Sequence, residues 1–253
     1  MTLLLISAQV EMRRLSRSGL LIGVLVVFGF FGLAGPALAL SMPEILKAAA
    51  GTEQLRIEAA EATPADGIAL FNQSAMQLGL ILAVVMAITS LGWDARPGSS
   101  IFYRTRVGNL ASLSVPRLAL CCLAVISSYF VALLLAVGLT TVFIGELPPS
   151  LVGAVGLSSA LYLVMAMSIG FLIMALVRRT AAAIAATTVL MLVLPLLNSI
   201  RAFGPWVPTT LLTASGADFV DLALPMLSAI AVSAVCVVVA GFAANRQSLR
   251  RDA

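Results

Sequence analysis

The chain has 253 residues, of which 61% are apolar and only 10% are charged, and its mean hydropathy is +1.10. A soluble domain carries about 25% charged and about 45–50% apolar residues. The 15 basic and 11 acidic side chains are therefore too few to cover a water-soluble fold of this length. The composition excludes a soluble enzyme, a disordered protein and a secreted disulfide scaffold, and it predicts an all-α integral membrane protein.

The reactive side chains also limit the chemistry that this chain can perform, because it has no histidine and only three cysteines. The lack of histidine excludes His-ligated metals, haem axial His ligands and His general bases. Cys121 and Cys122 are adjacent and no C-x-x-C pair occurs, so we interpret these residues and Cys236 as apolar packing residues. We expect no catalytic residue, metal or cofactor in this chain.

The first segment, residues 2–18, is predicted to be an amphipathic helix that runs into a membrane span. Its basic residues Arg13, Arg14 and Arg17 favour an elbow, residues 1–19, that lies on the cytoplasmic leaflet. The alternative is the basic region of a secretory signal. At helical spacing, the apolar stripe contains Leu5, Ala8, Met12 and Leu15, and the polar stripe contains Gln9, Arg13 and Ser16.

Six apolar stretches are long enough, or nearly so, to cross the roughly 30 Å bilayer core. The fifth is short, contains Pro195 and runs into Asn198. The polar residues between the first two stretches, about 41–72, are predicted to be an outer segment with at most a short surface helix. The six predicted spans are residues 20–40, 73–93, 118–144, 151–177, 181–197 and 222–243.

The charges between these stretches predict the topology. With both termini in the cytoplasm, 12 of the 15 basic residues lie inside, and only Lys47, Arg56 and Arg201 lie outside. This is the bias of the positive-inside rule. No acidic or basic side chain falls within a predicted span, which argues against coupling to protons or cations.

Residues 1–39 also resemble a cleavable secretory signal, with Ala37, Leu38 and Ala39 at the end of the apolar run. Cleavage there would leave five spans. We favour an uncleaved first helix, because the segment before the apolar run is long and patterned. Glycines recur through this helix, and two explanations remain open: close approach of another helix, or the ordinary tolerance of glycine in membrane helices.

The inner segment, residues 94–117, begins with a turn at Arg96, Pro97 and Gly98. A short amphipathic helix is predicted over residues 101–107, with apolar and basic side chains side by side. Such a helix suits docking against a soluble partner, and contact with lipid headgroups is the alternative. The candidate docking residues are Ile101, Phe102, Tyr103, Arg104 and Arg106.

The last outer segment, residues 198–221, is too apolar for a free loop. Gly204, Pro205 and Pro208 interrupt it. We predict one or two short re-entrant helices that neighbouring helices shield from lipid.

The order of these elements resembles the membrane subunit of type-2 ATP-binding-cassette (ABC) transporters, over essentially the whole chain. That family's loop after the second span reads E-x-x-x-G-T and is followed by a Pro-basic turn. Here Asp94, Gly98 and Ser99 stand near the first motif, and Pro116-Arg117 matches the turn. The opening acid is Asp instead of Glu, and the final position is Ser instead of Thr.

The resemblance implies a permease subunit in a bacterial plasma membrane that exports a hydrophobic or amphipathic substrate. Residues 101–107 would be the coupling helix that docks on a nucleotide-binding subunit, and the elbow would touch the same subunit. Two such subunits would carry ATP and Mg²⁺, and a second permease chain, identical or related, would complete the path. The sequence agrees with an ATPase on a separate subunit, because no G-x-x-x-x-G-K-[ST] phosphate loop occurs in this chain.

In this family the path is lined by the second and fifth spans. The resemblance therefore makes five polar residues candidates for the path lining, although a polar residue in a span can also bond its own backbone. A secondary transporter or a structural membrane subunit without an ATPase remains the alternative. An intramembrane enzyme is disfavoured, because no His is present to activate a serine. The candidate lining residues are Asn72, Gln73, Gln77, Thr187 and Thr188.

Overall fold

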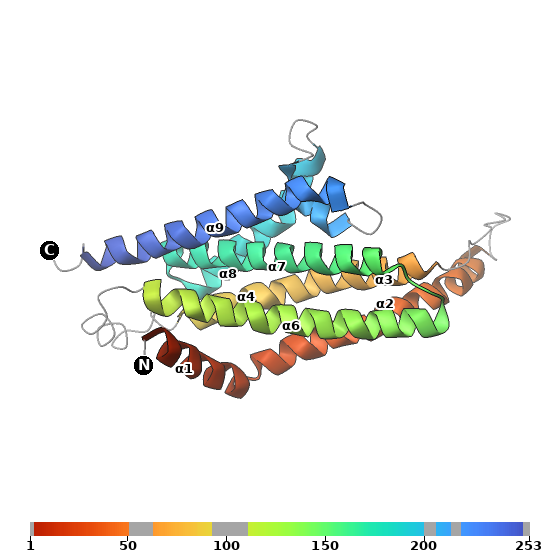
Figure 1. Cartoon of the computed structure of the whole chain (residues 1–253), viewed down its shortest axis with the longest axis horizontal. Coiled ribbons are helices and arrows are strands. Elements are labelled where there is room, and N and C mark those ends of the chain that lie inside the picture. The colour runs from red at the N-terminus through yellow and green to blue at the C-terminus, as the bar shows by residue number, and fades with distance from the viewer. Residues whose placement is uncertain (1–2, 51–62, 93–110, 200–205, 214–218, 250–253) are drawn as a thin grey trace.

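The computed structural model describes residues 3–50, 63–92, 111–199, 206–213 and 219–249. Within these ranges every regular element is helical, and the long helices lie side by side in one bundle (Figure 1). Five helices are long and apolar enough to span a bilayer, so the chain is a multi-pass membrane protein. These candidate spans are Leu20–Ile45, Pro64–Leu91, Leu113–Phe143, Pro149–Val177 and Leu222–Ala243.

The predicted amphipathic segment is helix α1 (Leu3–Arg17), which is separated from α2 (Leu20–Ala50) by a sharp break. The break occurs at Gly19, whose φ of +70° is open to glycine and strained for other residues. Helix α1 packs along α6 (Ala111–Phe143). Its predicted apolar stripe is wrong in part: Leu15 is buried, but Met12 is exposed and Glu11 is buried in its place.

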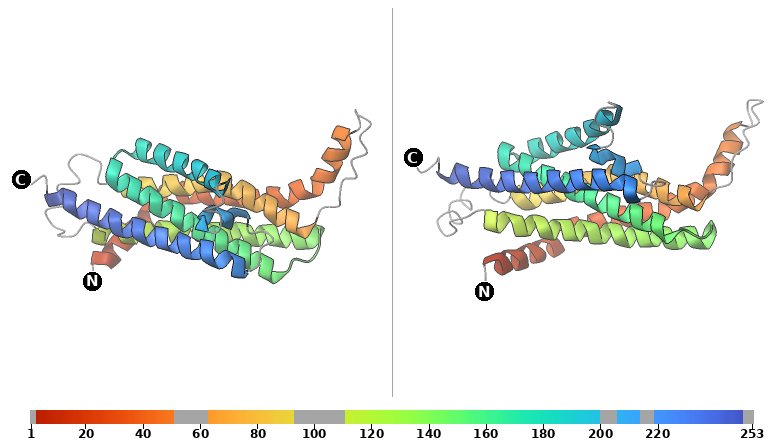
Figure 2. Two further views of the ribbon diagram at one scale, coloured as in Figure 1. Left: turned by 90° about the horizontal axis from the view of Figure 1, so that it is seen from above. Right: turned by 45° about the horizontal axis from the view of Figure 1, so that its top comes forward.

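Helix α2 extends well beyond the predicted end of the first span at residue 40. The residues that follow are mostly good helix formers, such as Ala, Leu, Glu and Lys. Pro36 and Pro43 lie inside the helix, where a proline bends an α-helix by removing a backbone hydrogen bond. Figure 2 shows the last part of α2 leaving the bundle at an angle.

The second span begins earlier than predicted, at Pro64 instead of Gln73. It consists of α3 (Pro64–Ser74), a π-helical turn η1 (Ala75–Gly79) and α4 (Leu80–Leu91). Thr63 caps α3 in a capping box with Asp66. The predicted outer segment 41–72 is therefore wrong at both ends, because α2 and α3 occupy most of it.

Helices α6, α7 (Pro149–Val177) and α9 (Phe219–Leu249) correspond to three further predicted spans. The predicted fifth span, 181–197, is instead α8 (Thr180–Val193) followed by a 3₁₀ helix, η3 (Leu194–Ser199). The α-helical part is about 21 Å long at 1.5 Å per residue, shorter than the bilayer core. The helix type changes just before Pro195, so five of the six predicted spans correspond to helices long enough to cross a bilayer and the sixth does not. Within the predicted re-entrant segment, η5 (Pro208–Thr213) is a short 3₁₀ helix.

The start of α1 and the end of α9 lie at the same end of the bundle (Figure 1). Arg178 and Arg179 form the turn between α7 and α8 at this end, which we call the basic end. The opposite end carries Glu44, Asp66 and Glu146 in or beside the ends of α2, α3 and α6. These three acids thus lie at the end of the bundle opposite Arg178 and Arg179.

The prediction that no acidic or basic side chain lies within a span needs correction. Glu44, Asp66 and Arg117 fall inside candidate spans. Glu44 and Asp66 lie within the terminal turn of their span, and Arg117 lies just over one turn from the start of its span. The central parts of the described spans remain uncharged.

Two glycines of α2 explain how closely the helices approach. A Cβ atom on Gly32 would stand 2.6 Å from the carbonyl oxygen of Ala132 in α6. A Cβ atom on Gly35 would stand 2.6 Å from the Cα atom of Phe71 in α3. By contrast, a Cβ atom on Gly29 would have no neighbour within 4 Å. The close-approach explanation therefore holds for Gly32 and Gly35, and tolerance is sufficient for Gly29.

Candidate functional site

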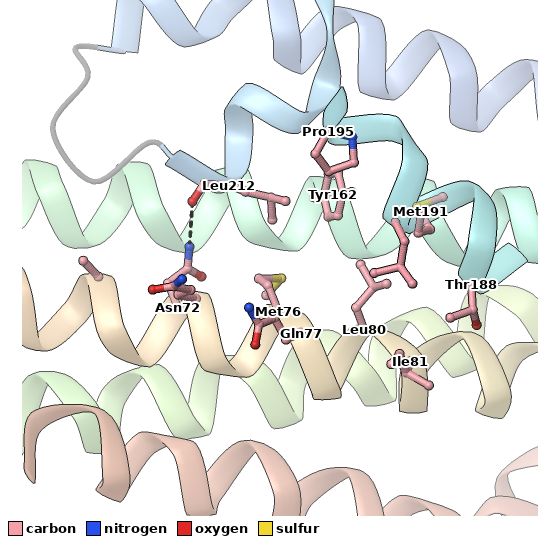
Figure 3. Close-up of a pocket in the computed structure, with 13 residues that line it drawn as sticks. Asn72, Met76, Gln77, Leu80, Ile81, Tyr162, Thr188, Met191, Pro195 and Leu212 are labelled. Carbon is pink, nitrogen blue, oxygen red and sulfur yellow. Dashed lines mark hydrogen bonds between the residues drawn. The ribbon is translucent and has the colours of Figure 1, made fainter. Parts of the chain in front are cut away.

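A cavity of about 520 Å³ lies between the second span and the helix pair α8–η3, with η5 at one side (Figure 3). This volume is in the range of pockets that bind small molecules. Its polar lining residues are Asn72, Gln73, Gln77, Tyr162 and Thr188. Its apolar lining residues are Ala69, Met76, Leu80, Ile81, Met191, Leu192, Pro195 and Leu212.

The structure brings four of the five candidate path residues together on this cavity, namely Asn72, Gln73, Gln77 and Thr188. The fifth, Thr187, is buried and does not line it. Its hydroxyl donates to the carbonyl oxygen of Ala183 at 2.7 Å. This is the backbone bonding that makes a polar residue acceptable within a membrane helix.

Asn72 joins the walls of the cavity. Its amide oxygen accepts hydrogen bonds from the Tyr129 hydroxyl at 3.0 Å and the Ser159 hydroxyl at 2.7 Å. Its amide nitrogen donates to the carbonyl oxygen of Leu212 at 3.4 Å (Figure 3). One side chain of α3 therefore contacts α6, α7 and η5, and Asn72 is almost completely buried.

Tyr129 is held between aromatic rings of two other helices. Its ring stacks on Phe71 of α3 with the centroids 5.7 Å apart, and it meets the edge of Phe28 of α2 at 5.8 Å. Such pairs contribute about 0.5–1.5 kcal/mol each beyond the area they bury. The tyrosine hydroxyl is thereby directed at Asn72.

The π-helical turn η1 lies at the centre of the cavity wall and contains Gln77. A π-turn inserts an extra residue into the helix and occurs frequently at functional sites. At its end, a methyl group on Gly79 would overlap the Phe28 ring. Sequence patterns did not reveal this turn, and glycine at position 79 is the one local signal for close packing there.

Gln73 and Gln77 are exposed, although they lie in the middle of a membrane span. Gln77 is about 20 Å of helix from either end of the span at 1.5 Å per residue. An amide that faces hydrocarbon without a partner costs several kcal/mol. The two amides therefore require water, a ligand or another protein surface beside them.

A second polar cluster, which sequence reasoning missed, lies at the basic end. The carboxyl group of Glu11 is buried, 3.7 Å from Nη1 of Arg14 and 3.7 Å from Nε of Arg117. Arg14 also donates to the carbonyl oxygens of Thr89 and Ser90 at 2.9 and 3.1 Å. These contacts tie α1 to the last turn of α4 and the first part of α6.

Burial raises the pKa of the Glu11 carboxyl above its ordinary value, because the loss of water outweighs the attraction of Arg14 and Arg117. An acidic residue among the basic residues of α1 was the available sequence signal. The amphipathic pattern did not place it inside, because that pattern ranks residues by polarity alone.

The predicted docking residues Ile101, Phe102, Tyr103, Arg104 and Arg106 lie outside the described residues. Of the elbow arginines, Arg13 and Arg17 are exposed, and Arg14 makes the contacts described above. Among the described residues no cluster of His, Cys, Asp and Glu is arranged to hold a metal ion.

Comparison with known proteins finds no match for this chain among protein-family models, curated proteins or solved structures. The functional conclusions below therefore depend on the residues and their geometry, together with the resemblance of layout.

Proposed function

We propose that this chain is the permease subunit of an ABC transporter in a bacterial plasma membrane, with both termini in the cytoplasm. It forms, with a second permease chain, the path of a hydrophobic or amphipathic substrate, which is exported. A separate nucleotide-binding subunit, in two copies, binds ATP and Mg²⁺ and supplies the energy. This chain carries no catalytic residue of its own.

The observation that carries the proposal is the cavity beside the second span. Exposed amides of Gln73 and Gln77 face it at mid-membrane depth, and α8 forms its other wall. Contact between lipid chains and a cavity with exposed polar groups at this depth is unfavourable. Such a cavity is favourable as one half of a path that a second chain completes.

The placement of charges supports an external source of energy. Transporters that are driven by protons or cations usually carry ionisable groups within the membrane. In the described spans the acidic and basic side chains, Glu44, Asp66 and Arg117, lie near the helix ends. The cavity lining itself is uncharged.

The buried cluster around Glu11 gives the proposal a mechanical basis. Through Arg14, α1 is bonded to the last turn of α4, and α4 leads directly into the inner segment 94–117. In our proposal, a partner that moves this segment also moves α1 and the second span. The second span carries Gln73 and Gln77, so the motion reaches the cavity.

The test is a double charge reversal, Arg104→Glu with Arg106→Glu, in the full chain. We expect loss of co-purification of the ATPase subunit, while the amount of chain in the membrane is unchanged. The matched control reverses two other charges at the same end, Arg179→Glu with Arg246→Glu, and retains the partner. Equal retention of the ATPase by both doubles would contradict the proposed docking helix.

A further inference from the structure

We infer that the cavity beside the second span binds an uncharged amphipathic small molecule, with Gln73, Gln77, Thr188 and Tyr162 as its polar contacts. This inference deepens the proposed function, because it specifies the substrate class of the same cavity. It is tested without the partner ATPase.

The lining of the cavity carries no charge, which favours an uncharged ligand. None of the described residues around the cavity carries a charge at neutral pH, and both ends of the second span lie about 20 Å of helix from Gln77. A charged ligand would lose its hydration there without gaining a counter-ion, which is strongly unfavourable at low dielectric. The cavity therefore selects against anions and cations alike.

The polar groups that remain available define the second requirement. Asn72 is already engaged, since its oxygen accepts from Tyr129 and Ser159 and its nitrogen donates to Leu212. Gln73 and Gln77 are exposed on the cavity side, and each amide offers two donors and an acceptor. A ligand with neutral oxygen or nitrogen groups, such as hydroxyls, amides or esters, matches them.

Tyr162 of α7 gives a third argument for a ligand. Its side chain is only 2% exposed and lines the cavity. Among the described residues its hydroxyl has no hydrogen-bond partner. A buried phenol normally finds a partner, so a polar group within the cavity would satisfy it.

The apolar part of the lining accommodates the body of the ligand. Met76 and Leu80 of the second span and Met191 of α8 all line the cavity (Figure 3). Methionine side chains are unbranched and flexible, and they adapt to irregular apolar shapes. The volume of about 520 Å³ suits one drug-sized molecule.

The experiment uses three dansyl sulfonamides that share one hexyl chain and differ at its end: a methyl, a carboxylate or an ammonium group. Binding to the purified full chain in nanodiscs is measured by fluorescence and corrected for partition into empty nanodiscs. We expect the uncharged probe to bind at least about tenfold more tightly than either ion. Equal or tighter binding of a charged probe would overturn the inference.

Two variants locate the binding. Gln77→Leu is expected to weaken the uncharged probe about five- to tenfold, because a polar contact is lost. The matched control Gln9→Leu replaces an exposed glutamine of α1 and leaves binding unchanged. Equal effects of the two substitutions would place the probe elsewhere and overturn the inference.

A third variant is expected to gain affinity for a charged probe instead of losing affinity for the uncharged one. Arginine remains charged in proteins, so Gln77→Arg is expected to make the carboxylate probe the tightest of the three. An unchanged order of affinities in Gln77→Arg would overturn the inference even if Gln77→Leu folds poorly.

These outcomes are separable from those of the proposed function. Tight binding of the uncharged probe, in a chain that retains no ATPase from its native membrane, would support the ligand class and contradict the transporter proposal. Tight binding of a charged probe, in a chain that does retain an ATPase, would contradict the ligand class and support the transporter proposal.

Discussion

The hydroxyl of Tyr129 donates a 3.0 Å hydrogen bond to the amide oxygen of Asn72, across the boundary between α6 and α3. The same oxygen accepts from Ser159 of α7. Three helices thus share one acceptor within the membrane-spanning bundle. The wall of the cavity that bears Gln73 and Gln77 is fixed in place by this shared contact.

Asn72→Leu is expected to destabilise the folded chain by about 1–3 kcal/mol, because two buried hydroxyls lose their acceptor. Tyr129→Phe removes a single donor and costs less, about 0.5–1.5 kcal/mol. The measurement is reversible unfolding in mixed micelles. The neighbouring change Gln73→Leu is the control, since the exposed Gln73 amide supports no such network. Equal losses for Asn72→Leu and Gln73→Leu would contradict the assigned role of Asn72.

Gly32→Ala is expected to destabilise the bundle by about 1–3 kcal/mol, the usual cost of overpacking. Its methyl group would meet the Ala132 carbonyl oxygen at 2.6 Å, so α2 and α6 must separate. Gly29→Ala, three residues away on the same helix, meets no atom within 4 Å. It is expected to be neutral or slightly stabilising, because alanine has the higher helix propensity. Thermal melting of the two variants side by side tests this difference, and a Gly32→Ala variant as stable as Gly29→Ala refutes it.

Stability is expected to fall with rising pH through the titration of Glu11. Its pKa in the folded chain is raised above the ordinary value of 4.5, so between these two values the folded state binds more protons than the unfolded state. The stabilisation from the protonated carboxyl is complete below pH 4.5 and is lost as pH rises through the folded pKa.

Glu11→Gln should remove this component, and melting temperatures measured from pH 4.5 upward should then decline less than in the parent chain. Glu146→Gln, a change at an exposed carboxylate of the opposite end, should leave the decline intact. A parental slope in Glu11→Gln would mean that Glu11 is not the responsible group.

Arg14 is expected to hold α1 on the bundle. In Arg14→Gln, the bonds to the carbonyl oxygens of Thr89 and Ser90 are lost, and the amide protons of α1 should exchange faster. Arg13→Gln alters an exposed neighbour in the same helix and should leave exchange unchanged. Hydrogen exchange read by mass spectrometry distinguishes them, and identical rates in both variants would show that α1 is held by other contacts.

Much of the fold was predictable from hydropathy, because a bilayer requires long apolar helices with charges outside the core. The helix ends were less predictable. The length of the outer segment was overestimated, because α2 continues through residues such as Glu44 that are polar yet good helix formers. The Thr63-x-x-Asp66 spacing of the capping box was a readable signal for the start of α3.

The candidate site was predictable in composition but not in detail. Four of the five candidate path residues, Asn72, Gln73, Gln77 and Thr188, line one cavity; that they line a transport path stays a prediction. Periodicity alone could not separate Thr188 from Thr187, because adjacent residues on a helix differ by about 100° in direction. The burial of Glu11 depends on Arg117, more than a hundred residues away in the chain, and local patterns carry no information on such a contact.

The central claim is that this chain is a conduit whose energy comes from another subunit. The most direct measurement is affinity purification of the tagged full chain from its own bacterial membrane in a mild detergent, followed by mass spectrometry and an ATPase assay. The account predicts a stoichiometric second polypeptide with a G-x-x-x-x-G-K-[ST] phosphate loop, together with Mg²⁺-dependent ATP hydrolysis. Recovery of the intact, folded chain without such a polypeptide and without ATPase activity would contradict it.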